Sequence, residues 1–398
     1  MDTLITETEA SSGLTYSEQT AFLYASEHRS LSTSGLFERI SSPVCVPGSH
    51  DDRLSPAIAQ AFQRARQAGQ SLPIVVGAIP FDTTQPSCLY IPDSYTVTTK
   101  SELVSRARKH TAAGPTALTL NSVPDECQFK SIVAEAVERF RRGELSKAVL
   151  SRILDIELAS PVKAQTILNN LMVQNAGGYH FSLPLPDGSV LLGASPELLL
   201  RKQGNVIVSN PLAGSARRMN DEHLDYLNSQ RLLKSGKDKH EHKLVVDDIR
   251  QRLMPLCASL TIPSVPSLMH TASMWHLSTA IRGELANPEM TALQVACQLH
   301  PTPALCGFPT QEARQLIAEL EPHDRGVFSG IVGWCDANGD GEWAIAIRCG
   351  TIKHNKVRLF AGAGIVEASV PEDEWAETAA KLNTMLNAFG LNSGVDGL

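Results

Sequence analysis

Apolar residues recur along the chain at two spacings, and each spacing predicts a different kind of element. Helical spacing marks residues 52–68, 129–143, 164–174, 292–299, 311–320 and 371–389, and the charged section after residue 221 is also predicted to be helical. Short apolar runs that end at glycine, proline or polar turns predict strands at 74–81, 179–183, 190–193, 275–281, 330–334, 343–348 and 357–361. A further strand, which carries Lys147, is predicted after the helix that ends at Gly143.

The order of these elements predicts the fold class. Strands follow one another in hairpin-like succession with helices between some of them, which favours an α+β fold of antiparallel sheets with helices on the outside. The chain has no internal repeat or low-complexity linker, so we expect a single large domain. Within it we expect a more variable N-terminal part at residues 1–120, a catalytic region at 121–391 and a flexible tail at 392–398.

Composition and charge narrow the choice of partners. The formal charge of −7 over 398 residues, without a basic stretch, argues against binding to nucleic acid. No run of about 18 apolar residues could span a membrane, and the start of the chain does not resemble a signal peptide. The eight cysteines form no CxxC pair, which is typical of reduced thiols. We therefore expect a cytoplasmic protein that binds a small molecule, and we expect a monomer.

Three segments resemble common binding motifs without completing them. Residues 336–341 copy the first half of a calcium loop, but the twelfth position is not the required glutamate, so a polar hairpin turn is expected instead. Residues 240–242 begin a zinc-protease motif, yet Leu244 replaces its second histidine. Residues 362–364 begin a dinucleotide fingerprint, but Glu367 replaces its third glycine. Calcium binding, zinc proteolysis and a Rossmann site are therefore not expected.

Two ionisable residues lie among apolar neighbours. Lys147 shares one face of its predicted strand with Val149 and Ser151, and a desolvated amine there would serve as a general base near neutral pH. The alternative is an edge-strand lysine that prevents aggregation. Glu197 follows an apolar strand and precedes three leucines, so its carboxyl should hold a proton longer than usual and could act as a general acid. The alternative is a glutamate at a helix start, next to Pro196.

Further charged residues could bind an anion or a cation. Glu374, Glu377 and Lys381 share one face of the C-terminal helix, where two carboxylates and an ammonium suit a hydrated cation and an anionic ligand. The alternative is an exposed ion pair on a solvated face. Arg348 ends the predicted strand 343–348, where alternation sets it beside small alanines that leave room for a carboxylate. Glycines at 362 and 364 would let a ligand approach the backbone, and the alternative is that they are ordinary turn glycines.

Taken together, these motifs resemble the chorismate-utilising enzymes over nearly the whole chain. The similarity is greatest to isochorismate synthases of the branch that supplies 2,3-dihydroxybenzoate to catecholate siderophores. The segments that carry it are 76–82, 88–92, 193–197, 211–218, 239–242, 300–304, 331–334, Arg348, 362–366 and the helix with Glu374, Glu377 and Lys381.

The resemblance implies an Mg²⁺-dependent, reversible isomerisation of chorismate, in which water adds at C2 and the C4 hydroxyl leaves. Lys147 would activate the water and Glu197 would protonate the departing hydroxyl. Glu241 and Glu377 would bind Mg²⁺ directly, and Glu374 through a coordinated water. The resemblance also implies a set of substrate-binding residues: Gly214, Ser215, His276, Ala304, Leu305, Arg348, Gly362, Gly364 and Lys381.

The same resemblance leaves alternatives open. Aminodeoxychorismate synthases carry a nucleophilic lysine where this chain has Ala213, and ammonia-using members generally lack the lysine base found here as Lys147, so water is the expected nucleophile. A salicylate synthase, which goes on to eliminate pyruvate from isochorismate, shares both residues and remains the alternative. A non-catalytic chorismate-binding protein would not need the paired acid and base.

Overall fold

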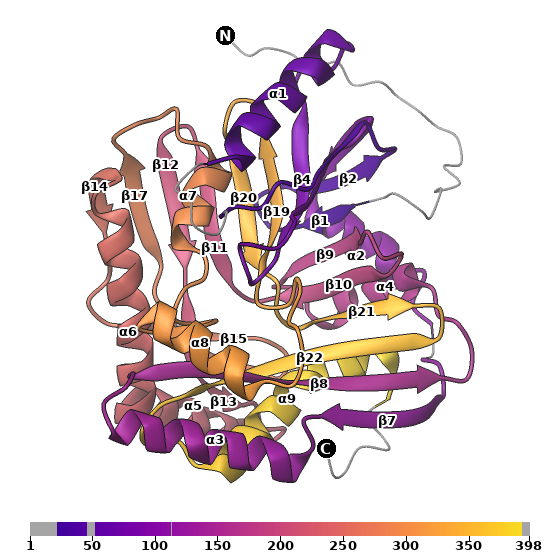
Figure 1. The fold of residues 1–398 in the computed structure, drawn as a ribbon. Helices are drawn as coiled ribbons and strands as arrows, with labels where there is room; N and C mark the ends of the chain where they lie inside the picture. Colours follow the sequence, from indigo (N-terminus) through magenta and orange to yellow (C-terminus); the bar gives the residue numbers. More distant parts are fainter. Residues whose placement is uncertain (1–21, 46–51, 113, 392–398) are drawn as a thin grey trace.

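The computed structural model describes residues 22–45, 52–112 and 114–391 (Figure 1). Within these ranges the strands form three sheets, and every strand pairing is antiparallel. Helices lie on the outer faces of the sheets (Figure 1). The predicted α+β fold with antiparallel sheets is therefore confirmed. The expected tail, 392–398, lies outside the described residues.

The first sheet contains the longest strands of the described chain and holds most of the segments around the candidate site. Its order is β18 (Gly307–Phe308), β8 (Lys147–Leu158), β22 (Lys356–Ile365), β21 (Cys349–Lys353), β10 (Val190–Ser195), β9 (Tyr179–Pro184), β1 (Leu23–Ala25), β2 (Ser30–Ser34) and β6 (Ser94–Thr98), and β7 (Ala117–Val123) also pairs with β8. The predicted hairpin of β9 and β10 is confirmed by its register, which pairs Val190 with Pro184.

The second sheet packs against the first, and a small third sheet lies beside them. The order of the second is β14 (Cys257–Thr261), β17 (Ile281–Leu285), β12 (Val206–Asn210), β11 (Leu198–Gln203), β20 (Gly341–Ile345), β19 (Ile331–Asp336), β4 (Ile74–Ile79), β5 (Cys88–Ile91) and β3 (Glu38–Ile40). The third consists of β13 (Leu212–Arg217), β16 (Met274–Ser278) and β15 (Ser267–His270). Strands from the N-terminal third of the chain belong to both large sheets, since β1 pairs with β9 and β4 with β19.

Most helices lie where the apolar periodicity predicts them. The helices are α1 (Leu54–Gln67), α2 (Lys100–Arg108), α3 (Glu126–Arg141), α4 (Ala164–Gln174), α5 (Glu222–Lys234), α6 (Gly236–Leu253), α7 (Ala292–Leu299), α8 (Thr310–Leu320) and α9 (Pro371–Phe389), and α2 was not predicted. Helix α9 begins at Pro371, whose missing N–H costs nothing in the first turn, and is capped after Phe389 by Gly390, which adopts the left-handed conformation that favours glycine. Within the described residues, no helix combines the length and the apolar character that a membrane span requires.

The hydrophobic core is divided among the faces of the two large sheets. One cluster fills the space between them and includes Phe181 from β9 and Trp334 from β19. A second lies between the outer face of the second sheet and helices α1, α6 and α7. A third packs α4 and the C-terminal half of α9 on the first sheet. Burial of this apolar surface on both sides fixes the two sheets and α9 relative to one another.

Two strands were wrongly predicted to continue across a break or a turn in the backbone. The segment 275–281 is interrupted, because β16 ends at Ser278 and a new strand, β17, starts at Ile281 in a different sheet. The segment 343–348 was predicted as one strand, but β20 ends at Ile345 and Arg348 has a positive φ of 49°. Alternation therefore does not set the direction of the Arg348 side chain; the turn that follows β20 does. The hairpin predicted at 336–341 is confirmed, since β19 pairs with β20 there.

Candidate active site

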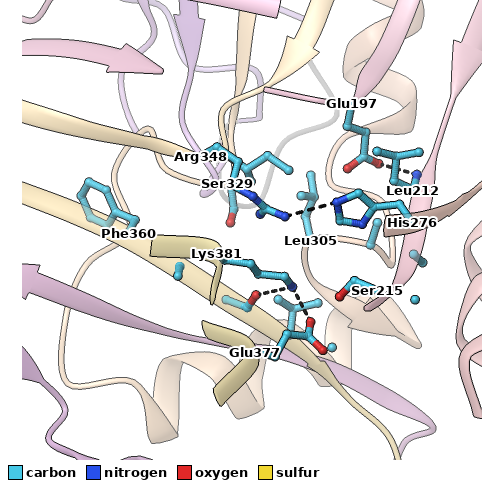
Figure 2. Close-up of a pocket in the computed structure, with 18 of the residues that line it drawn as sticks. Glu197, Leu212, Ser215, His276, Leu305, Ser329, Arg348, Phe360, Glu377 and Lys381 are labelled. Carbon is cyan, nitrogen blue, oxygen red and sulfur yellow. Dashed lines mark hydrogen bonds and ion pairs between the residues drawn. The ribbon is translucent and has the colours of Figure 1, made fainter. Parts of the chain in front are cut away.

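A cavity lies where β8, β22, the small third sheet, α6 and α9 meet (Figure 2). Its walls are formed by Val149, Glu197, Leu212, Ala213, Gly214, Ser215, Glu241, His276, Ala304, Leu305, Phe328, Ser329, Ile347, Arg348, Phe360, Ala361, Gly362, Gly364, Glu377 and Lys381. All of the predicted site residues line this cavity except Lys147 and Glu374. Segments separated by more than 200 residues in the sequence are thus brought to one place, while the roles of these residues stay predictions.

Lys147 is fully buried at the start of β8, with 0% of its surface exposed. Its Nζ lies 2.9 Å from Oε1 of Glu241 on α6, which lines the cavity. That contact is not well directed as a hydrogen bond, and Nζ has no hydrogen-bond partner among the described residues. The edge-strand alternative is wrong, because β8 lies between β22 on one side and β18 and β7 on the other. A buried amine with unused hydrogen-bonding capacity beside a cavity is suited to proton transfer.

Gly364 on β22 makes room for this ion pair. A Cβ atom at this position would come 2.2 Å from Oε1 of Glu241 and 3.2 Å from Cε of Lys147. The glycine is therefore needed for close approach, and the alternative of a turn glycine is wrong because β22 continues to Ile365.

Glu197 occupies the short connection between β10 and β11, with 4% of its surface exposed. Burial raises the pKa of its carboxyl to about 7, against the opposing effects of the Leu212 N–H and of Lys147, Arg348 and Lys381. Its Oε1 accepts a hydrogen bond of 3.2 Å from the backbone N–H of Leu212 (Figure 2). The alternative of a helix-start glutamate is wrong, because strands flank it on both sides. The carboxyl is protonated for about half of the time near pH 7, as a general acid requires.

Arg348 is buried and has no carboxylate within ion-pair distance among the described residues. Its Nη2 lies 3.4 Å from Nε2 of His276, and its Nε has no hydrogen-bond partner there. Burial lowers the pKa of Arg348 to about 10, so the guanidinium still carries its charge at neutral pH. Burial, together with the charges of Arg348 and Lys381, holds the pKa of His276 well below its usual value. A buried guanidinium that has no carboxylate partner among the described residues, next to a neutral imidazole, is suited to bind an anion.

Helix α9 supplies the opposite wall. Nζ of Lys381 lies 2.5 Å from Oε1 of Glu377 and donates a hydrogen bond of 2.8 Å to the carbonyl of Gly362 (Figure 2). Burial alone would raise the pKa of Glu377, but Lys381 holds it below its ordinary value. The alternative of an exposed ion pair is wrong, since both side chains line the cavity and α9 packs against β22.

Glu374, one turn earlier on α9, is 1% exposed and pairs with Lys237 of α6 at 2.7 Å. Burial, reinforced by the charge of Glu377, raises the pKa of Glu374 to about 7. Burial also raises the pKa of the nearby Asp238.

In the described part of the chain, no three acidic, histidine or cysteine side chains are already grouped as a metal site. The donor set nevertheless fits a hard cation, because the carboxylates of Glu241 and Glu377 share one cavity and oxygen is the ligand that Mg²⁺ prefers.

Several contributors were not predicted from the sequence. Lys237 and Asp238 precede Glu241 by about one helical turn, and that spacing could have identified them. Ser329 has a positive φ of 58°, a conformation that no pattern in its neighbourhood signals. Val149 was identified only as a neighbour of Lys147, and Phe328 and Phe360 look like ordinary core residues in the sequence.

The cavity combines groups with complementary charge. The buried amine of Lys147 beside the cavity and the buried, partly protonated carboxyl of Glu197 could act as a base and an acid, and Arg348 and Lys381 could bind anionic groups. Two further carboxylates, Glu241 and Glu377, lie in the same walls. Such a site suits acid–base chemistry on a small ligand with more than one carboxylate.

Comparisons with known proteins agree with this chemistry. Residues 65–390 match the family model described as "Chorismate binding enzyme". The chain is 48% identical to the isochorismate synthase EntC of Escherichia coli K12, over 93% of this chain and 95% of that protein, and 43% identical to the isochorismate synthase DhbC of Bacillus subtilis 168, over 98% of each. A solved structure from Bacillus anthracis, described as a 2,3-dihydroxybenzoate-specific isochorismate synthase, DhbC, has a TM-score of 0.87 and 40% identity, and covers 95% of this chain and 98% of that chain.

Proposed function

Because the chain belongs to the family of chorismate-binding enzymes, we propose that it is an isochorismate synthase, an isomerase that converts chorismate into isochorismate. The similar proteins are named isochorismate synthases, and the alignment covers nearly their whole length. A buried acid and a buried base at the cavity are what the reaction requires. We also propose that the product supplies 2,3-dihydroxybenzoate for a siderophore, in the cytoplasm, and that the enzyme acts as a monomer. The description of the Bacillus anthracis relative supports the link to 2,3-dihydroxybenzoate.

In the proposed reaction, Lys147 accepts a proton from a water molecule as that water forms a bond to C2 of the ring. The double bonds of the ring shift, and the bond from C4 to its hydroxyl breaks. Glu197 donates its proton to the departing hydroxyl, which leaves as water. The atoms balance, since one water enters and one leaves. The electrostatic influence of Lys147 on the Glu197 carboxyl supports this pairing, because it requires the two groups to be near each other.

Charge complementarity supports the proposed binding mode. Arg348 would bind one substrate carboxylate, because it is a buried cation without a carboxylate partner of its own among the described residues. Lys381 adds a second positive charge at the same cavity. Glu241 and Glu377 would hold Mg²⁺, with Glu374 acting through water, and the bound ion supplies positive charge for the second carboxylate. Ser215, Gly214, Ala304 and Leu305 would shape the cavity around the ring.

Product analysis tests the proposed function. We expect purified protein, incubated with chorismate and MgCl₂, to form isochorismate without release of pyruvate. Formation of salicylate together with pyruvate would replace the proposal with a salicylate synthase. Binding of chorismate without any turnover would identify a non-catalytic member of the family. The similar proteins are named isochorismate synthases, which favours the first outcome.

The proposed Mg²⁺ site predicts a specific effect of Gly364→Ala. The added Cβ would collide with the end of the flexible Glu241 side chain, so the protein should fold while Glu241 is displaced. We expect the Mg²⁺ concentration for half-maximal activity to rise by about 10-fold or more, in line with the loss caused by disturbing a ligand's support. Excess EDTA should abolish the activity of the unmodified enzyme, and added MgCl₂ should restore it.

Gly177→Ala serves as the matched control, because a Cβ at Gly177 would meet no atom within 4 Å. This variant should keep the Mg²⁺ dependence of the parent enzyme. Full activity in excess EDTA, or an unchanged Mg²⁺ requirement in Gly364→Ala, would contradict the metal assignment.

A further inference from the structure

Strand β8 has a gap along one of its edges. On that edge β18 pairs with Lys147 and Ala148, and the register with β7 begins again at Ile153. Between these partners the carbonyl of Val149 and the N–H of Ser151 face no strand. Unpaired backbone groups in a buried strand are costly, so this gap requires other partners.

A buried ion pair fills the gap. Nη2 of Arg325 donates a hydrogen bond of 2.6 Å to the Val149 carbonyl, and Oε1 of Glu321 accepts one of 2.7 Å from the Ser151 N–H. The same Oε1 accepts a hydrogen bond of 2.9 Å from Oγ of Ser151. Arg325 and Glu321 thus satisfy the acceptor and the donor that a neighbouring strand would otherwise satisfy.

The pair is rigid in itself. Nε of Arg325 donates to Oε2 of Glu321 at 2.8 Å, and Nη2 donates to Oε1 at 2.5 Å, which is the two-pronged arrangement of guanidinium and carboxylate. Each side chain is only 3% exposed, and the guanidinium carbon lies 4.4 Å from the centre of the Phe81 ring. Because the two side chains have few other conformations available, they fix the position of the backbone groups to which they bond.

Arg325 also reaches a second wall of the cavity. Its Nη1 donates a hydrogen bond of 2.9 Å to the carbonyl of Leu305. Val149 and Leu305 both line the cavity, and Lys147 lies two residues before Val149 on the same strand. The guanidinium of Arg325 therefore bonds both to β8, which carries Lys147, and to Leu305, which lines the cavity. Neither Arg325 nor Glu321 lines the cavity itself.

We propose that the Arg325–Glu321 ion pair is the positioning device of this active site, which sets Lys147 and the Ala304–Leu305 wall relative to each other. Arg325 and Glu321 are positioning residues, because they act through the backbone of β8 and of Leu305. The inference rests on the proposed function only for the role of Lys147 as the base. A displacement of the base by about 1 Å is enough to reduce a rate about 100-fold, so the pair should affect turnover more than binding.

The test uses two conservative variants and a matched control. Arg325→Lys keeps the charge but loses the planar fork, and Glu321→Gln keeps the shape but loses the charge. The control is Arg358→Met, which removes an exposed two-pronged pair between Arg358 and Asp155 at the far end of the same strand. Kinetics with chorismate are measured together with hydrogen–deuterium exchange of peptides that cover residues 148–152 and 303–308.

We expect kcat to fall about 10- to 100-fold in the two variants while KM stays within about 3-fold, the signature of an interaction needed in the transition state. Exchange should become faster in both peptides, and the control should behave like the parent enzyme. Unchanged exchange in both peptides would overturn the inference, and so would a raised KM with an unchanged kcat. If the parent enzyme makes no isochorismate, the proposed function fails, and the exchange data still decide whether the pair fixes the two walls.

Discussion

Replacing Lys147 with alanine is expected to lower kcat for isochorismate formation by about 1,000-fold, within the range of about 10² to 10⁴ that a positioned base contributes. The physical reason is that the amine is fully buried, has no hydrogen-bond partner among the described residues and lies beside the cavity. Water in the cavity would then lack a group that accepts its proton as it attacks the ring. Steady-state kinetics with chorismate and Mg²⁺ measure the loss.

The control for this variant is Lys202→Ala. Lys202 is also buried, and it pairs with Asp340 at 3.4 Å in the second sheet, away from the cavity. Both substitutions leave a carboxylate without its lysine. The two variants are therefore compared at equal folded fraction, which circular dichroism and thermal unfolding determine. A Lys147→Ala enzyme with a near-normal kcat, or an equal loss of kcat in Lys202→Ala, would remove Lys147 from the role of base.

Replacing Glu197 with glutamine is expected to lower kcat/KM by about 100-fold or more, because an amide cannot donate a proton to the departing hydroxyl. In the parent enzyme, burial raises the pKa of Glu197 to about 7. The acid form is present below this pKa and is lost as the pH rises through it. The pH profile of kcat/KM should therefore fall above about pH 7, and this descending limb should be absent in Glu197→Gln.

Glu342→Gln provides the control for the pH profile. Glu342 is a second fully buried carboxyl whose pKa is raised by burial, but it lies on β20 near Tyr24 and does not line the cavity. Its replacement should leave the descending limb in place. A limb that persists in Glu197→Gln, or that disappears in Glu342→Gln, would show that another group is the acid.

The sequence predicted best the elements whose conformation is decided by a pattern of apolar residues within the element itself. Helix α4 was predicted at 164–174 and α7 at 292–299, the bounds that the structure has. The hairpin of β9 and β10 was also predicted, because polar turn residues separate two apolar runs. In each case the information that decides the conformation lies within one element.

The errors arose where the chain changes direction for reasons outside the segment. The apolar run continues from Trp343 to Ile347, yet β20 ends at Ile345 and the backbone at Arg348 turns with a positive φ. The same holds for Thr279, where the chain leaves the third sheet and enters the second. Pairing with strands that are distant in the sequence fixed these ends, and a local pattern carries no information about such partners.

The predictions about the candidate site show the same difference between local and long-range information. Sequence motifs identified most of the predicted side chains that line the cavity, and Lys147 and Glu197 were singled out from their apolar neighbours alone. Only the tertiary structure showed that Lys147 contacts Glu241, that Glu374 pairs with Lys237, and that Gly364 is needed to admit the Glu241 carboxylate. Arg325 and Glu321 carried no signal at all, since their importance lies in a gap between two strands.

By itself, then, the sequence determined the α+β class, the positions of most helices and the family, because periodicity and ordered motifs are written along the chain. The structure alone decided which charges are buried together and which side chains bond to the strand that carries Lys147. The physical reason is that the energy of a charge depends on its burial and its neighbours, and folding brings both from elements far apart in the chain.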